Sequence, residues 1–277
     1  MRVRAFAKIN LSLRVLGRRP DGYHELRTMF QSIALHDTLT IRRVRGPFTL
    51  TCDDSTCPGG RDNLVWRAAE KVWRAAGRRG PPRGVAIHLS KGIPMQAGLG
   101  GGSSDAAAAI RALAKTWGLR DEQRQHALAA SVGADVPYFL EGGTVLGVER
   151  GDVLFPLMDR SPAWVVLVIP PFGVSTKQAF GWFDRAGDSP RLKRSSVPND
   201  FERVVGERHP EIRRSIRALR SAGASLATLS GSGAAVFGLF SRRPEADAAA
   251  AELWAPGRRT IVTRTIDRRT CRRLAAK

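Results

Sequence analysis

A cluster of glycines and hydroxyl residues runs directly into a helix pattern, and this combination most limits what the chain can fold into. Residues 94–104 read Pro-Met-Gln-Ala-Gly-Leu-Gly-Gly-Gly-Ser-Ser, and apolar residues then recur at helical spacing from Ile110 to Trp117, before Gly118. Glycines let backbone N–H groups close on an anion, and a helix N-terminus adds about half a positive charge with unpaired donors. The segment therefore predicts a phosphate-binding loop at a helix start, in preference to a flexible turn before a core helix.

The two commoner phosphate loops do not match this segment. The Walker pattern needs a Lys before its final Ser or Thr, and residues 98–104 contain none. The dinucleotide pattern needs a third glycine where this chain has Ser103. The expected loop is therefore of another kind.

Composition sets wider limits on the class of protein. The chain has 277 residues, 43% of them hydrophobic, which allows one large domain or two moderate ones. Its first eight residues include Arg2, Arg4 and Lys8 where a secretory apolar run would lie, and no stretch reaches the roughly 20 apolar residues that span a bilayer. Three cysteines without a CxxC pattern support neither a disulfide framework nor a zinc site. We expect a cytoplasmic protein without membrane association.

The formal net charge of +20 comes mostly from arginine. Such a charge attracts nucleic acids and other polyanions. The basic residues are scattered, however, and no aromatic residues are interleaved with them to form a base-stacking surface. A solvated, arginine-rich surface is the favoured interpretation.

Short apolar runs alternate with helix patterns along the chain, which indicates a mixed α/β protein. Strands are predicted at residues 3–16, 33–41, 85–89, 144–154, 164–169 and 234–240, and helices at 64–76, after the glycine loop, and at 122–132, 200–222 and 243–254. Residues 156–162 form a plausible boundary between two halves. Residues 187–198, rich in Ser, Pro, Arg and Lys, predict an exposed loop.

Lys8 and Asn10 stand two residues apart on an otherwise apolar strand pattern. This spacing puts both side chains on one face, while Ala7, Ile9 and Leu11 face the core. A lysine that faces a phosphate site could neutralise charge during phosphoryl transfer. A surface lysine on a strand is the alternative interpretation.

Asp135 lies in the apolar segment Gly133–Phe139, where Pro137 is expected to hold Val136 in extended geometry and so stiffen a turn. A fixed carboxylate near a substrate hydroxyl can accept or orient its proton. A capping or turn aspartate is equally compatible with the pattern.

A second Gly-Ser loop, Leu229–Ala234, leads into an apolar strand pattern. Alone it carries little information. Together with the first loop it suggests a two-sided enclosure of phosphate or sugar oxygens.

These ordered motifs resemble the superfamily of galactokinase, homoserine kinase, mevalonate kinase and phosphomevalonate kinase, whose phosphate loop is similar to residues 94–104. Ala7–Leu11 and Gly17–Leu26 narrow the resemblance to the family that phosphorylates 4-diphosphocytidyl-2-C-methyl-D-erythritol in non-mevalonate isoprenoid biosynthesis. The similarity extends over nearly the whole chain through Asp62–Leu64, Gly133–Pro137, Gly173–Thr176, Asn199–Phe201 and Ser230–Phe237.

The resemblance implies an α/β fold of α+β type, a two-domain small-molecule kinase with its active site in the interdomain cleft. Residues 1–156 would form the ATP-binding and catalytic domain, and residues 157–277 would complete the substrate cleft. ATP and Mg²⁺ would be the cofactors, and a cytidyl diphosphate sugar alcohol the substrate, phosphorylated on its 2-hydroxyl. The protein would act as a monomer or homodimer, with no membrane or specific nucleic-acid partner.

The resemblance also assigns roles to residues. Asp135 would take or orient the hydroxyl proton, and Lys8 would lie beside it, keeping it ionised and offsetting charge on the transferring phosphoryl group. Cofactor-binding residues would be Asn63, near the adenine, and Pro94, Met95, Gln96, Ala97, Gly98, Leu99, Gly100, Gly101, Gly102, Ser103 and Ser104. Substrate-binding residues would be Asn10, Tyr23, His24, Phe30, Thr176 and Phe180.

Within the substrate set, Tyr23 and Phe180 would sandwich the cytosine and His24 would bind its edge, because a flat base suits two aromatic faces and one polar group. Gln96 departs from the family pattern, since close relatives usually have a small residue there, and its side chain could crowd or hydrogen-bond the nucleotide. No acidic residue matches the magnesium ligand of the mevalonate kinase branch, so the ion would be held mainly by the nucleotide, with Ser104 nearby.

Two other functions stay open at this point. The same fold could phosphorylate another small alcohol, such as homoserine or mevalonate, although the Asp21–His24 loop suits a substrate that contains a base. A non-enzymatic nucleic-acid binder would use the +20 charge instead.

Overall fold

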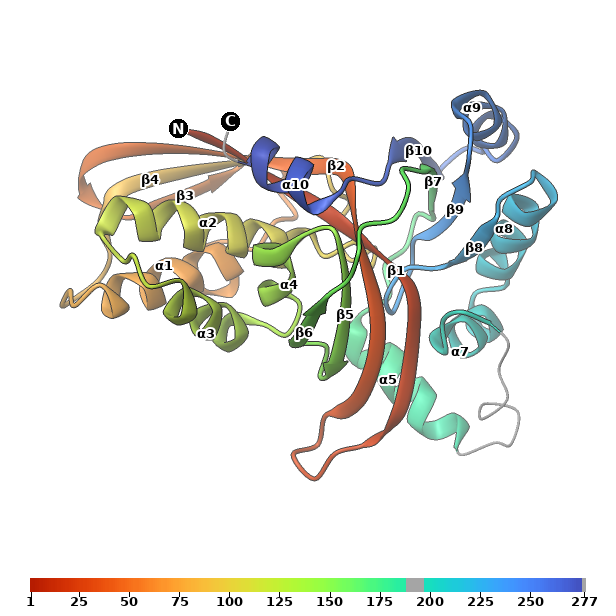
Figure 1. Cartoon of the computed structure of the whole chain (residues 1–277), viewed down its shortest axis with the longest axis horizontal. Helices are drawn as coiled ribbons and strands as arrows, with labels where there is room; N and C mark the ends of the chain where they lie inside the picture. The colour runs from red at the N-terminus through yellow and green to blue at the C-terminus, as the bar shows by residue number, and fades with distance from the viewer. Residues whose placement is uncertain (188–196, 276–277) are drawn as a thin grey trace.

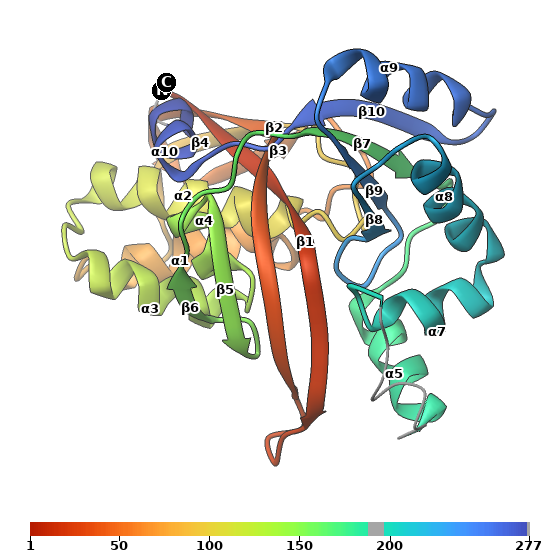
Figure 2. The ribbon, with the colours of Figure 1, turned by 45° about the vertical axis from the view of Figure 1, so that its right-hand side comes forward.

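The computed structural model describes residues 1–187 and 197–275, which form two β-sheets with helices packed on them. Figure 1 shows helices α1 to α4 gathered on one side and α7 to α9 on the other, with the long β1–β2 hairpin between them. Figure 2, turned by 45°, shows the same arrangement. The mixed α/β architecture predicted from the sequence is confirmed.

The N-terminal sheet has the strand order β3-β4-β2-β5-β6, with β1 paired to β2, and only the β3–β4 ladder is parallel among these pairs. Its strands are β1 (Arg2–Arg18), β2 (His24–Pro47), β3 (Thr49–Cys52), β4 (Arg83–Ser90), β5 (Thr144–Glu149) and β6 (Val153–Pro156). Its helices are η1 (Gly60–Asp62), α1 (Leu64–Ala75), α2 (Gly101–Trp117), α3 (Glu122–Val132) and α4 (Val136–Glu141). The apolar faces of the helices and the sheet bury one core, in which Val72, Leu89 and Leu113 are fully enclosed.

The C-terminal sheet is antiparallel, with the strand order β10-β7-β9-β8. Its strands are β7 (Trp164–Ile169), β8 (Leu226–Leu229), β9 (Val236–Phe240) and β10 (Arg259–Arg264). The helices of this half are α5 (Thr176–Ala186), α7 (Phe201–Arg208), α8 (Pro210–Ser221) and α9 (Arg243–Glu252), and they are followed in the chain by α10 (Arg268–Ala275). Strand β7 is buried almost throughout, as its uninterrupted apolar sequence predicts.

Strand β1, which pairs with β2 of the N-terminal sheet, also contacts the C-terminal half. Ile9 is fully buried in a cluster with Val165 and Phe237 of the C-terminal sheet. Further along, the backbone carbonyl of Leu13 accepts a hydrogen bond from the N–H of Asp200 at 3.0 Å. The prediction that Ala7, Ile9 and Leu11 face a core is therefore confirmed, and this core lies between the halves.

Two predicted elements are divided in the structure, and one predicted geometry is wrong. The strand expected at 144–154 is two strands, β5 and β6, which pair across a turn at residues 150–152. The helix expected at 200–222 is two helices separated at His209, because Pro210 has no N–H and begins α8 instead of continuing α7. Val136 is not extended: it is the first residue of α4, and Pro137 fits within that first turn.

Several elements have no counterpart in the prediction, namely β3, α4, α5, β8, β10 and α10. The loop expected at 187–198 falls mostly on residues 188–196, outside the described residues. In the described ranges, no helix combines the length and the apolar character that a bilayer crossing needs.

The domain division at residue 156 stays a prediction. The last strand of the N-terminal sheet, β6, ends at Pro156, and the first strand of the C-terminal sheet, β7, begins at Trp164. The last described helix, α10, leaves the C-terminal half and packs on β1, where Cys271 and Ile266 form a small buried cluster with Phe6. Helix α10 therefore covers part of β1 with a small apolar cluster, separate from the main N-terminal core.

Candidate active site

A cavity of about 990 Å³ is lined by β1, β2, the glycine loop, α5 and the second Gly-Ser loop, so both halves contribute to it. Nearly all of the residues that sequence analysis selected line this one cavity: Lys8, Asn10, Tyr23, His24, Phe30, Asn63, residues 94–103, Asp135, Thr176 and Phe180. The structure thus brings together segments from residue 8 to residue 180.

The glycine loop adopts the backbone geometry that its composition predicts. Gly98 and Gly100 have φ values of 74° and 73°, and Gln96 also lies in the left-handed region at 51°. Gly100 is the N-cap of α2 and has no side chain to cap it. The N-terminal end of α2, with its uncapped first-turn N–H groups and positive dipole end, therefore faces the cavity as an anion site.

The two Gly-Ser loops touch each other. The hydroxyl of Ser230 donates to the carbonyl of Gly98 at 3.0 Å, and the N–H of Ala235 donates to the carbonyl of Ala97 at 3.1 Å. A Cβ on Gly98 would overlap the carbonyl oxygen of Ser230, so only glycine allows this approach. Gly231, the next residue after Ser230, lines the cavity.

Lys8 and Asp135 face each other beside the glycine loop. Lys8 Nζ lies 3.7 Å from Asp135 Oδ2 and donates to Asn10 Oδ1 at 2.6 Å. The Lys8 side chain is 4% exposed and that of Asp135 37%. Burial lowers the pKa of Lys8 below its ordinary value, and the attraction of Asp135 opposes this shift.

The backbone of β1 also fixes Lys8 against the phosphate loop. The N–H of Lys8 donates to the carbonyl of Leu99 at 3.0 Å. Asn10 in turn donates through Nδ2 to Thr28 Oγ1 at 2.7 Å. The backbone of Lys8 is thus fixed to the loop, and its ammonium group is bound by the side-chain amide of Asn10. The carboxylate of Asp135 is the charged partner of the ammonium group.

The opposite end of the cavity carries aromatic rings. The rings of His24 and Phe180 stack with centroids 4.4 Å apart and an interplanar angle of 19°, and His24 Nε2 is 2.7 Å from Asp184 Oδ1. Tyr23 is 56% exposed and lies under the guanidinium of Arg150, 5.2 Å from the ring centroid. The expected sandwich by Tyr23 and Phe180 stays a prediction, since His24 covers one face of Phe180.

Phe30 and Thr176 line the cavity between these ends. Phe30 packs on Tyr138 with ring centroids 4.7 Å apart, and the hydroxyl of Thr176 lies 3.3 Å from that of Ser232. Asn63 caps α1, its Oδ1 accepting from the N–H of Val65 at 2.9 Å.

Ser104 is placed differently from the rest of the predicted loop. It is 3% exposed, and its hydroxyl donates to the carbonyl of Phe6 at 2.7 Å. Its side chain is therefore engaged with β1, and Ser103 is the loop hydroxyl residue on the cavity wall. Direct binding of the nucleotide by the Ser104 hydroxyl is not supported by this geometry.

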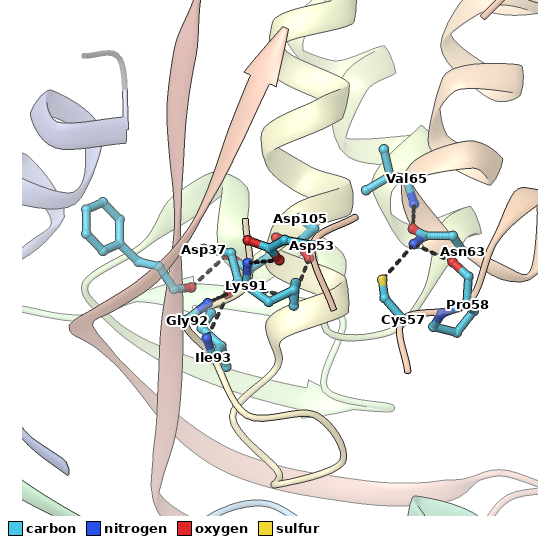
Figure 3. A network of polar contacts seen from close by, with 12 residues as sticks. Asp37, Asp53, Cys57, Pro58, Asn63, Val65, Lys91, Gly92, Ile93 and Asp105 are labelled. Carbon is cyan, nitrogen blue, oxygen red and sulfur yellow. Dashed lines mark hydrogen bonds and ion pairs between the residues drawn. The ribbon is translucent and has the colours of Figure 1, made fainter. Parts of the chain in front are cut away.

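A charged cluster beside the loop was missed by sequence analysis (Figure 3). Lys91, which lies between β4 and the loop, binds both Asp37 of β2 and Asp105 of α2, and Lys91 and Asp105 line the cavity. A detectable signal is the position of Asp105 before a run of alanines on the buried side of the helix.

Over residues 1–187 and 197–275, no group of three or more His, Cys, Asp or Glu side chains could hold a metal ion. The side chains present therefore do not fit a magnesium site made by the protein alone.

Comparisons with known proteins agree with this geometry. Residues 63–143 match the model of the GHMP kinases N terminal domain, and residues 184–258 that of the GHMP kinases C terminal domain. A 4-diphosphocytidyl-2-C-methyl-D-erythritol kinase of Pelotomaculum thermopropionicum is 41% identical, with 96% of this chain and 98% of the relative covered. One of Moorella thermoacetica is also 41% identical, with 95% and 98% covered.

Solved structures give the same result. A crystal structure of 4-(cytidine 5'-diphospho)-2C-methyl-D-erythritol kinase has a TM-score of 0.78 and 35% identity, covering 96% of this chain and 99% of that one. A mevalonate kinase with a TM-score of 0.72 and 15% identity, covering 96% and 99%, shares the fold.

The two-sheet fold, with its glycine loop at the start of α2 and a facing Lys–Asp pair, defines a small-molecule kinase of the GHMP class. Within that class, the chain belongs to the family of 4-diphosphocytidyl-2-C-methyl-D-erythritol kinases.

Proposed function

We propose that the chain transfers the γ-phosphoryl group of ATP to the 2-hydroxyl of 4-diphosphocytidyl-2-C-methyl-D-erythritol, a step of non-mevalonate isoprenoid precursor biosynthesis. The observation that carries this proposal is the Lys8–Asp135 pair, 3.7 Å apart, in the cavity that the phosphate loop and the aromatic residues share. The names of relatives about 40% identical over most of the chain support the substrate.

Asp135 and Lys8 act on the acceptor hydroxyl and the phosphoryl group. Asp135 is exposed enough to accept the hydrogen of the 2-hydroxyl, which points the oxygen lone pair at the γ-phosphorus. Lys8 stabilises the carboxylate and the negative charge on the transferring group. Most of the work in phosphoryl transfer is positioning and electrostatics, so a strong base is not needed.

The triphosphate binds along the glycine loop, where the backbone N–H groups at the start of α2 donate to its oxygens. Mg²⁺ would be held mainly by the phosphate oxygens of ATP, and it would neutralise part of the triphosphate charge. The remaining contacts of the loop are made by the protein backbone, which glycine leaves accessible.

The cytosine binds among Tyr23, His24 and Phe180 at the other end of the cavity. Insertion of the base between Tyr23 and Phe180 requires the imidazole of His24 to leave the face of Phe180, on which it now stacks. Asp184 then remains a hydrogen-bond partner for the displaced imidazole.

A coupled assay of ATP consumption tests this function. The cytidyl diphosphate substrate, homoserine and mevalonate are offered in turn, each with ATP and excess Mg²⁺. We expect turnover with the cytidyl diphosphate substrate only. Turnover confined to homoserine or mevalonate would refute the assignment, and ATP-independent binding of nucleic acid without any turnover would favour the binding-protein alternative.

A further inference from the structure

Three charged side chains are buried together beside the phosphate loop, and the proposed reaction does not use them (Figure 3). The ammonium of Lys91 donates to Asp105 Oδ2 at 2.7 Å and also to Asp37 Oδ2. Their side chains are 6%, 3% and 0% exposed for Lys91, Asp105 and Asp37. Such a cluster has one cation for two carboxylates.

The two carboxylates differ in how their oxygens are satisfied. Asp37 Oδ1 accepts from the backbone N–H groups of Gly92 at 2.6 Å and Ile93 at 2.8 Å. Asp105 Oδ1 is buried and has no hydrogen-bond partner among the described residues. An ionised oxygen without a donor is costly in such a site, so a proton shared by the pair belongs on Asp105.

The charge of the cluster leads to the same assignment. With both carboxylates ionised the cluster has a net charge of about −1 in a low-dielectric site, and one proton makes it neutral. Burial raises the pKa of Asp105 to about 7; Lys91 opposes this shift and Asp37 adds to it. The pKa of Lys91 lies above its ordinary value because the two carboxylates outweigh the effect of burial, so the lysine stays charged.

The cluster is placed to respond to a bound nucleotide. Asp105 begins the second turn of α2, and it lines the cavity together with Gly100 to Ser103. A triphosphate on that loop brings several negative charges close to Asp105. Like charges disfavour one another, so nucleotide binding favours the protonated carboxyl.

We propose that Asp105 is a positioning residue of the nucleotide site and takes up a proton when ATP binds, so that the Asp37–Lys91–Asp105 cluster is neutral while the triphosphate occupies the loop. Asp37 and Lys91 meanwhile connect the two ends of the loop, the N–H groups at Gly92 and Ile93 and the start of α2. This inference rests on the proposed function, because it requires ATP at the glycine loop.

The other polar groups around Asp105 do not supply this proton exchange. Cys57, from the loop after β3, has its pKa raised to about 12, first by burial, and stays a neutral thiol. Asn63, at the head of α1, is uncharged. Asp53 is exposed, and within the described part of the chain its carboxylate accepts one hydrogen bond, from the backbone N–H of Lys91 at 2.9 Å.

Calorimetric titration of the protein with ATP, in excess Mg²⁺ and in two buffers of different ionisation enthalpy, measures the proton exchange. At pH 7.5 we expect the wild type to take up about half a proton per ATP, if bound triphosphate raises the pKa of Asp105 by about one unit. Asp105→Asn is isosteric, keeps an acceptor for Lys91, and should take up close to none. Asp53→Asn, the matched control, removes an exposed carboxylate at the same lysine and should behave as the wild type.

The affinity for ATP gives a second measurement. Wild-type affinity should fall by up to about tenfold between pH 6.5 and 8.5, and that of Asp105→Asn should stay nearly constant. If the wild type binds ATP without taking up protons, or if Asp105→Asn takes up as many as the wild type, the inference is overturned and the proposed function is not affected. No ATP binding by any variant would refute the proposed function and the inference together.

Discussion

Substitution of Gly98 by alanine should separate the two Gly-Ser loops. Gly98 has φ +74°, and a Cβ there would overlap the carbonyl oxygen of Ser230 and lie 3.1 Å from that of Gly233. The left-handed conformation alone costs alanine about 1–2 kcal/mol. Overpacking against a fixed backbone adds about 1–3 kcal/mol, so the variant should lose about 2–5 kcal/mol of unfolding free energy.

Gly118→Ala is the matched control, because Gly118 has φ +86° and open space at its Cβ position. It should lose only the conformational part, about 1–2 kcal/mol. Unfolding in urea measures both variants, and kcat/KM for ATP measures the loop. Gly98→Ala should lower kcat/KM for ATP at least about tenfold, because a displacement of about one ångström in a catalytic site costs that much or more. Gly118→Ala should keep the wild-type kcat/KM. Equal losses of stability in the two variants, with ATP kinetics intact in both, would refute the close packing of the loops.

Three further predictions concern charged groups. Asp135→Asn should lower kcat by about 10²–10⁴-fold with ATP affinity nearly unchanged, because it removes the acceptor for the hydroxyl proton; unchanged turnover in a kinetic assay would exclude Asp135. Lys8→Met should lower kcat by about 10²–10³-fold through loss of charge stabilisation, and a loss seen only in the KM for ATP would argue against that role. Asp105→Asn should change the pH dependence of stability. The pKa of Asp105 is raised from 3.8 to about 7 in the folded state, so between these values the folded protein binds more protons than the unfolded chain. The unfolding free energy of the wild type therefore falls as the pH rises from about 4 to 7, by up to about 4 kcal/mol. Urea unfolding at pH 5 and 8 should show about 2–3 kcal/mol of that fall in the wild type and none in the variant, and parallel falls would disprove it.

The limits of two predicted elements agree with the structure. The helix predicted at 122–132 and the strand predicted at 164–169 have those limits in the structure. Two of the errors involve prolines, since the sequence pattern predicts a stiff turn at Pro137 and a helix that continues through Pro210. Each instead occupies the first turn of a new helix, where its missing N–H has no cost.

The site was predictable only where its residues stand in motifs. The glycine loop and the Lys8 to Asn10 pair are local patterns, and both line the cavity. The partnership of Lys91 with Asp37 joins residues 54 positions apart, and an isolated aspartate in a sequence resembles an ordinary turn residue. Spatial pairing of this kind leaves no periodic signal.

The position of β1 between the two halves has a consequence for synthesis of the chain on the ribosome. Ile9 and Leu11 leave the ribosome well before Val165 and Phe237, which belong to the cluster that buries them and follow more than a hundred residues later. The nascent N-terminal half therefore carries an uncovered apolar row until β9 has been made. Incomplete chains of this kind are prone to aggregation, so slow translation between residues 165 and 240 should increase the demand for chaperones.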